Sequence, residues 1–267
     1  MPGSGKPGRL LPPLAGVAVI LACITHAHAA SPQSNKDYCA PDGTNLVFVI
    51  DTTTPYDAKD KDLLVRAVGE IFETMRGGDR VVIRTISESF STSERLIDRC
   101  VPRCEAKNIW DDIFKCNQGI VANDTKKIKH EVAQALRDRL MRFKEQPRSD
   151  IIRTLSNLSR EEVQRGGRRV MYVFSDMIEN SDHMSGRTFF TTPTPQLIRY
   201  LRKYGLLASL KGAEVHVFGV GRDGTPSRAP LNVAALQKIM EFWKTYFQAS
   251  NAQSIEISPN IIDHGPE

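Results

Sequence analysis

Two uninterrupted runs of apolar residues, each as long as one β-strand, constrain this chain more than any other sequence feature. They are Leu46–Ile50, which leads into Asp51, and Val170–Phe174, which leads into Ser175 and Asp176. An uninterrupted apolar run suits a strand buried on both faces, as in a parallel sheet, better than an alternating edge strand. The sequence therefore predicts a parallel sheet covered on both sides.

The segments around these runs alternate between strand and helix patterns. In the segment 126–143, for example, Ile128, Val132 and Leu136 recur at the spacing of one helix face, and Asp124 or Thr125 could cap that helix. Such alternation predicts a doubly wound α/β fold, with a mostly parallel sheet and helices on both faces. In chain order we expect strands at 46–50, 80–87, 95–97 (a short edge strand), 168–174, 213–220 and 254–258, and helices at 59–75, 126–143, 151–164, 195–210 and 231–249.

The first 29 residues have the pattern of a signal peptide. Lys6 and Arg9 give a basic start, the segment 10–24 is largely apolar, and Ala27-His28-Ala29 offers a cleavage site. We expect an exported protein of bacterial type, periplasmic or secreted. Cys23 leaves a lipoprotein as the alternative.

The remaining chain is expected to form one domain. A polar linker spans 30–44, the domain spans 45–258, and a tail spans 259–267. No segment after the leader approaches the ~20 apolar residues that a membrane-spanning helix needs. The formal net charge is +5, but the basic residues are scattered and many lie near acids, as Lys127 does near Glu131. We therefore expect a mixed, solvated surface and no nucleic-acid partner.

Four cysteines follow the leader, and an even number in an exported chain predicts disulfides. Three pairings are possible; we expect Cys39 with Cys100 and Cys104 with Cys116. Zinc is the alternative for the last three, but no histidine stands near them at finger-like spacing.

Polar residues at the ends of the apolar runs form the candidate site. In a doubly wound sheet, ligands bind at the carboxyl ends of the strands. Asp51, Thr53 and Asp176 follow two such strands, and Ser149 precedes a predicted helix. Carboxylate and hydroxyl oxygens suit Mg²⁺ or Mn²⁺. The structural alternative is that these residues cap helices and turns.

This combination resembles the metal-ion-dependent adhesion site of von Willebrand factor A domains, and the resemblance spans about 45–258. In that family a strand ends in Asp-x-Ser-x-Ser, and a later loop and strand add a Thr and an Asp. Asp51 and Thr53 match the first motif, Ser149 resembles the later Thr, and Asp176 the later Asp. Two positions depart from the family pattern: Pro55 replaces the third motif residue, and Met177 replaces the Gly that often follows the later Asp.

The resemblance implies a non-enzymatic interaction module whose cation is completed by an acidic side chain of a protein partner. One alternative is a metal-dependent hydrolase or phosphatase that uses Asp51 and Asp176, and another is a degenerate, metal-free interaction domain. The sequence contains no Gly-x-Ser-x-Gly and no Walker-type motif. Gly219, Gly221 and Gly224 have dinucleotide-binding spacing but follow a late strand, where that motif does not belong.

The predicted loop 177–194 lies next to the candidate site. It is either a solvated loop or a specificity loop that contacts a partner. Its candidate side chains are Glu179, Asp182, His183 and Arg187.

Overall fold

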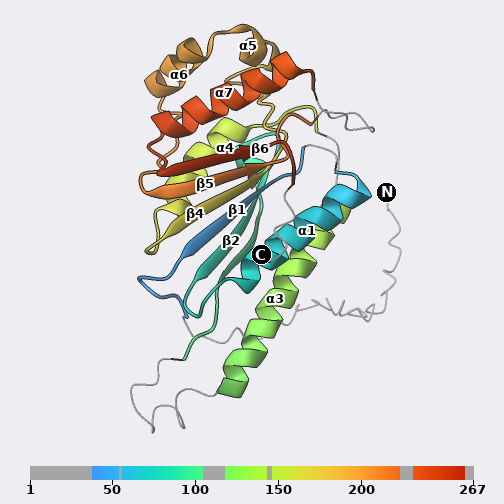
Figure 1. Ribbon diagram of the computed structural model, residues 1–267, viewed down its shortest axis with the longest axis vertical. Coiled ribbons are helices and arrows are strands. Elements are labelled where there is room, and N and C mark those ends of the chain that lie inside the picture. Colours follow the sequence, from blue (N-terminus) through green and yellow to red (C-terminus); the bar gives the residue numbers. More distant parts are fainter. Residues whose placement is uncertain (1–37, 54–55, 105–117, 143–145, 223–230, 262–267) are drawn as a thin grey trace, which may run out of the picture. The chain divides into compact units, whose positions relative to one another are not determined.

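The sheet of this protein is six-stranded and mostly parallel, as the apolar runs predict. A computed structural model describes residues 38–53, 56–104, 118–142, 146–222 and 231–261 (Figure 1). The strand order is β3-β2-β1-β4-β5-β6, and every pair is parallel except β2 with β3. The strands are β1 (Asn45–Asp51), β2 (Arg80–Ile86), β3 (Arg95–Cys100), β4 (Arg169–Phe174), β5 (Ala213–Phe218) and β6 (Ser254–Ser258).

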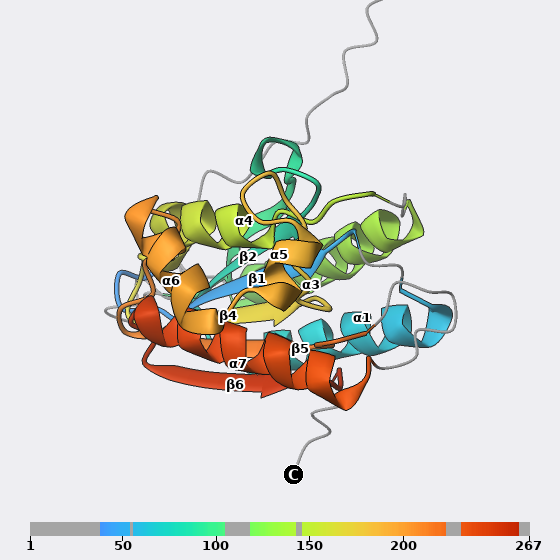
Figure 2. The same cartoon turned by 90° about the horizontal axis from the view of Figure 1, so that it is seen from above.

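Helices cover both faces of the sheet, so the fold is the doubly wound α/β type. Figures 1 and 2 show α1 (Ala58–Glu73) and α3 (Gln118–Met141) on one face. The other face carries α4 (Ile151–Leu158), α6 (Thr194–Lys203) and α7 (Val233–Ala249), with the short α5 (Gly186–Thr191) beside them.

The side chains of β1 alternate between two hydrophobic cores. Phe48 and Ile50 pack with the helices α1 and α3, whereas Val47 and Val49 pack with α4, α6 and α7. All seven residues of β1 are buried. This two-sided burial explains why the sequence of the strand is an uninterrupted apolar run.

Two helix predictions were wrong in their bounds, and one short helix was not predicted. Helix α3 begins at Gln118, so Asp124 and Thr125 lie inside it and cap nothing; the Thr125 hydroxyl instead donates to Val121 O (2.8 Å). The predicted helix 195–210 ends at Lys203, because Gly205 adopts a left-handed φ of 67°. The predicted loop 177–194 contains α5.

The predicted helix 151–164 is α4 followed by a π-helical turn, Ser159–Val163. The turn contains Glu162, a fully buried carboxylate at the opposite end of the sheet from Asp51. Glu162 forms ion pairs with Arg95 of β3 and with Arg80 of β2 (2.7 Å), and Arg80 also pairs with Asp98 (2.8 Å). A buried charge needs such partners, and these contacts anchor the antiparallel edge strand to the helix layer.

A disulfide joins Cys39 to Cys100, as expected, with 5.1 Å between the two Cα atoms. The bond ties the segment before β1 to the end of β3. Cys104 also takes part in a disulfide. Cys116 lies outside the described residues, so its pairing stays a prediction.

The predicted signal peptide and Cys23 also lie outside the described residues, as do most of the predicted linker and tail. In the part of the chain that the structure describes, no helix is both long and apolar enough to cross a membrane.

The disulfide is expected to contribute substantially to stability. It closes a loop with a sequence separation of 61 residues, and a loop of that size corresponds to about 4 kcal/mol in the chain-entropy model. Replacing Cys39 and Cys100 together by Ser should lower the free energy of unfolding by roughly 2–5 kcal/mol in urea titrations. If the urea midpoint and the slope of the titration were the same in the wild type and the double variant, the disulfide would constrain neither the folded nor the unfolded state.

Candidate functional site

Asp51, the last residue of β1, is the centre of a buried hydrogen-bond cluster. Its Oδ1 accepts hydrogen bonds from the backbone N–H (2.8 Å) and the hydroxyl (2.6 Å) of Thr53. Its Oδ2 accepts from the hydroxyls of Ser175 (2.6 Å) and Ser149 (3.4 Å). Four donors from three segments of the chain therefore converge on one carboxylate.

The electrostatics of Asp51 are unusual, because the residue has 0% relative exposure and these four partners carry no charge. Burial raises the pKa of Asp51, and the hydrogen bonds act in the opposite direction. Next to it, the Thr52 hydroxyl donates to Ile86 O (2.7 Å) and accepts from the guanidinium of Arg139 (3.2 Å). The ionised form of Asp51 would be stabilised by a cation placed close to it.

Ser149 reaches the cluster because two loops are joined beside it. Ser149 and Asn180 form an antiparallel bridge with N···O distances of 3.0 and 3.1 Å. Asp150 N donates to Ser87 O (3.0 Å), which attaches the same segment to the end of β2. The loop before α4 is thus held between the ends of β2 and β4.

The N-terminus of α4 is capped by a residue that the sequence did not point to. Asp150 occupies the N-cap position, but its side chain accepts no capping hydrogen bond. Instead, Glu179 Oε2 accepts from the backbone N–H groups of Ile151 (3.0 Å) and Ile152 (2.9 Å). Glu179 is fully buried, and burial raises its pKa to about 8.

Asp176 lies two residues beyond the end of β4, and 8% of its surface is exposed. Its Oδ1 accepts from Ile178 N (2.9 Å), and its backbone carbonyl accepts from Gly221 N (2.8 Å). Gly219 and Gly221 both have positive φ, so in this structure they shape the turn after β5. Gly224 lies outside the described residues.

Met177 adopts a left-handed φ of 60°, a conformation that glycine accepts more readily. Two contacts hold it there: its N–H donates to the Ser175 hydroxyl (2.9 Å), and its carbonyl accepts from Trp243 Nε1 (2.7 Å). Met177 therefore holds a conformation that glycine adopts more readily, at the position directly after Asp176.

The structure brings Asp51, Thr53 and Ser149 of the predicted set into direct contact and places Asp176 next to the cluster. It adds Ser175, which was not among the predicted ligands; its signal was the same as theirs, a hydroxyl directly after an apolar strand. Pro55 lies outside the described residues, so its effect on the site stays open.

The other loop residues divide between structural and surface positions. Glu179 is a buried helix cap, Asp182 pairs with Arg148 at the surface, and Arg187 is exposed. His183 is half-buried, and its N–H donates to the Ser181 hydroxyl (3.3 Å). Of these four residues, Asp182 and Arg187 are exposed.

The donor set fits a hard divalent cation in its chemistry. A hydroxyl that donates its hydrogen to Asp51 keeps its lone pairs for a metal ion, and both Thr53 and Ser149 do so. Among the described residues, no group of three or more His, Cys, Asp and Glu side chains could hold a metal ion. A cation here would therefore depend on hydroxyls and on at most two carboxylates.

No protein-family model matches the chain, and a search of curated proteins found no match. Solved structures similar to the chain include proximal thread matrix protein 1 from the mussel byssus, with 12% identity and a TM-score of 0.41, covering 84% of this chain and 44% of that one. They also include a von Willebrand factor type A structure from Catenulispora acidiphila, with 11% identity and a TM-score of 0.36, covering 79% and 43%.

A third is the pilus adhesin SpaC from Lactobacillus rhamnosus GG, with 11% identity and a TM-score of 0.44, covering 84% of this chain and 29% of that one. The chain thus spans less than half of the length of these three proteins. At these identities and TM-scores the likenesses carry no functional argument, so the function is argued from the site's own geometry.

Glu179 is expected to make stability depend on pH. Its pKa lies near 8 in the folded protein against an ordinary value of 4.5, so the folded state favours the protonated form. This contribution is complete below pH 4.5 and is lost as the pH rises to about 8, by an amount on the order of a few kcal/mol. Over that interval the free energy of unfolding should fall more steeply in the wild type than in Glu179→Gln. Equal slopes in pH-dependent urea titrations would contradict this assignment.

Proposed function

We propose that this chain is an exported protein-interaction module whose binding surface is the carboxyl-terminal edge of the sheet. The observation that carries the proposal is the cluster around Asp51. Hydroxyls from the segments that follow β1 and β4 and from the loop before α4 meet there at one buried carboxylate. The Cys39–Cys100 disulfide supports export, because disulfides persist in oxidising compartments.

In this proposal the site takes Mg²⁺ or Mn²⁺. Thr53, Ser149 and Asp176 would supply oxygen ligands, and Asp51 would hold the hydroxyls in orientation and balance part of the charge. Mg²⁺ usually keeps several waters and needs only one or two carboxylates from the protein, which suits this small set. The bound ion would present a positive charge at the edge of the sheet.

The chemistry of such a site selects an acidic partner. A carboxylate from another protein would complete the coordination, and the exposed Arg187 would add attraction. The burial of Asp51 favours this binding role over a hydrolase. A carboxylate with 0% exposure and four hydrogen-bond donors is not placed to attack a substrate.

Calorimetric titration of the purified protein with Mg²⁺ and Mn²⁺ tests the proposal. We expect saturable binding that is weakened at least about 10-fold in Asp176→Ala, because a ligand to the ion is removed. Asp138→Ala serves as the matched control, since Asp138 is an exposed carboxylate on α3, and should bind like the wild type.

Two outcomes would contradict this mechanism. Absence of binding to either ion would favour a metal-free interaction domain. Metal-dependent release of phosphate from a generic phosphoester, lost in Asp51→Asn, would instead favour the hydrolase.

A further inference from the structure

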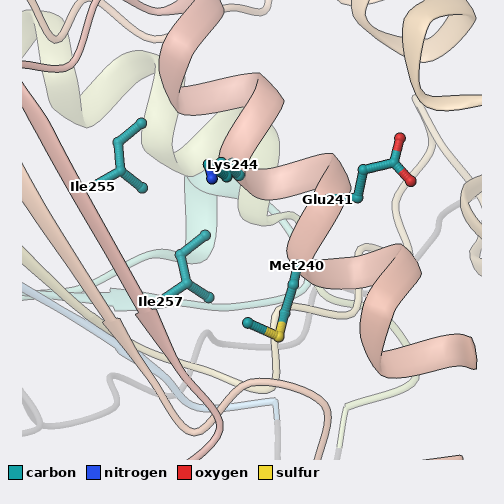
Figure 3. A pocket seen from close by; sticks show the side chains of 5 residues that line it. All are labelled: Met240, Glu241, Lys244, Ile255 and Ile257. Carbon is teal, nitrogen blue, oxygen red and sulfur yellow. The ribbon is translucent and has the colours of Figure 1, made fainter. Parts of the chain in front are cut away.

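A groove lies between helix α7 and strand β6, away from the Asp51 cluster. β6 is the last strand in the sheet order and pairs with β5, which leaves its outer edge open among the described strands (Figure 2). A cavity of about 260 Å³ lies between β6 and α7 (Figure 3). It is lined by Met240, Glu241, Lys244, Ile255 and Ile257.

The lining is apolar at its centre and charged at its margin. Ile255 and Ile257 project from β6 toward α7, and all three apolar side chains, including Met240, are only half-buried. Glu241 and Lys244 are exposed and carry opposite charges. An edge strand that offers apolar side chains beside unpaired backbone groups is a template for another strand.

The sequence of β6 identifies a fitting strand. Ser254–Ser258 is Ser-Ile-Glu-Ile-Ser, which is the same in both directions. If two copies pair antiparallel about Glu256, Ile255 of one copy lies opposite Ile257 of the other, on the α7 side. Such self-complementarity is what a two-fold symmetric interface requires.

Charge agrees with the same arrangement. A two-fold axis through the middle of β6 brings the two α7 helices together in opposite directions, so that Glu241 of each copy can face Lys244 of the other. The two Glu256 carboxylates also come close to the axis. Each Glu256 carboxylate is hydrogen-bonded to His216 on β5 of its own copy, with 2.8 Å between Glu256 Oε2 and His216 Nδ1. This contact directs the carboxylate toward β5 and away from the axis.

We propose that the chain forms a homodimer in which β6 pairs antiparallel with β6 of a second copy and the sheet continues across the two-fold axis. Ile255, Ile257 and Met240 form the apolar centre of this interface. Glu241 and Lys244 form reciprocal ion pairs at its margin. The surface around Asp51 stays open in this dimer, because it lies at the strand ends and not along the β6 edge.

Sedimentation equilibrium of the purified protein over about a hundredfold range of concentration tests the proposal. The wild type should show a concentration-dependent dimer. Glu241→Lys and Lys244→Glu should each weaken the dimer at least about 10-fold, because each places like charges opposite one another twice. Both residues are exposed, so neither change threatens folding. Gln237→Lys, an exposed position of α7 outside the groove, is the matched control and should dimerise as the wild type does.

The two-fold geometry also predicts that charge-swapped variants restore the dimer. An equimolar mixture of the two single variants should form a heterodimer, and the double variant E241K/K244E should dimerise with itself, because each restores both ion pairs. A wild type that stays monomeric at every concentration would overturn the proposal. So would a dimer that both single variants leave unchanged, since its interface would then lie elsewhere.

Discussion

The burial of β1 on both faces is the constraint on which the rest of the structure depends. All seven of its residues are covered, so helices must pack on each side of the sheet, and the strand can carry polar groups only where it ends. Its neighbours β2 and β4 run parallel to it and end at the same edge. The packing of the apolar residues in these strands therefore brings the polar residues that follow them to one edge of the sheet.

Asp51 shows what this arrangement does to a charged group. Its carboxylate is held by hydroxyls and a backbone N–H, and these contacts orient it without neutralising it. Glu162, at the other end of the sheet, is equally buried but is paired with two arginines. The contrast separates a carboxylate that is fully compensated inside the protein from one that would gain stability from an external positive charge.

The fold could be predicted from sequence because burial leaves a pattern. The runs before Asp51 and Ser175, and the stripe of Ile128, Val132 and Leu136, gave the strand and helix types correctly.

The bounds of helices and strands were less predictable where long-range contacts decide them. The π-turn contains Glu162, whose partners lie on β2 and β3, and the cap of α4 comes from Glu179, which is remote in sequence. Ser175 also follows a strand, but it was not included because it matches no position of the adhesion-site motif that selected the other four residues. The candidate ligands were found by their position relative to the strands and helices. The left-handed backbone conformation of Met177 could not be predicted, because methionine rarely adopts it.

The Cys39–Cys100 bond also matters for how the domain would carry mechanical force. Cys39 precedes β1, and Cys100 ends the edge strand β3. A pull on the chain before Cys39 is divided between the start of the central strand and, through a covalent link, the margin of the sheet. Without the disulfide, this force would act on β1 alone. With it, part of the force acts on the antiparallel pair β2–β3 and on the ion pairs of Glu162 with Arg80 and Arg95. A domain pulled from its N-terminal side would therefore resist unfolding from that end.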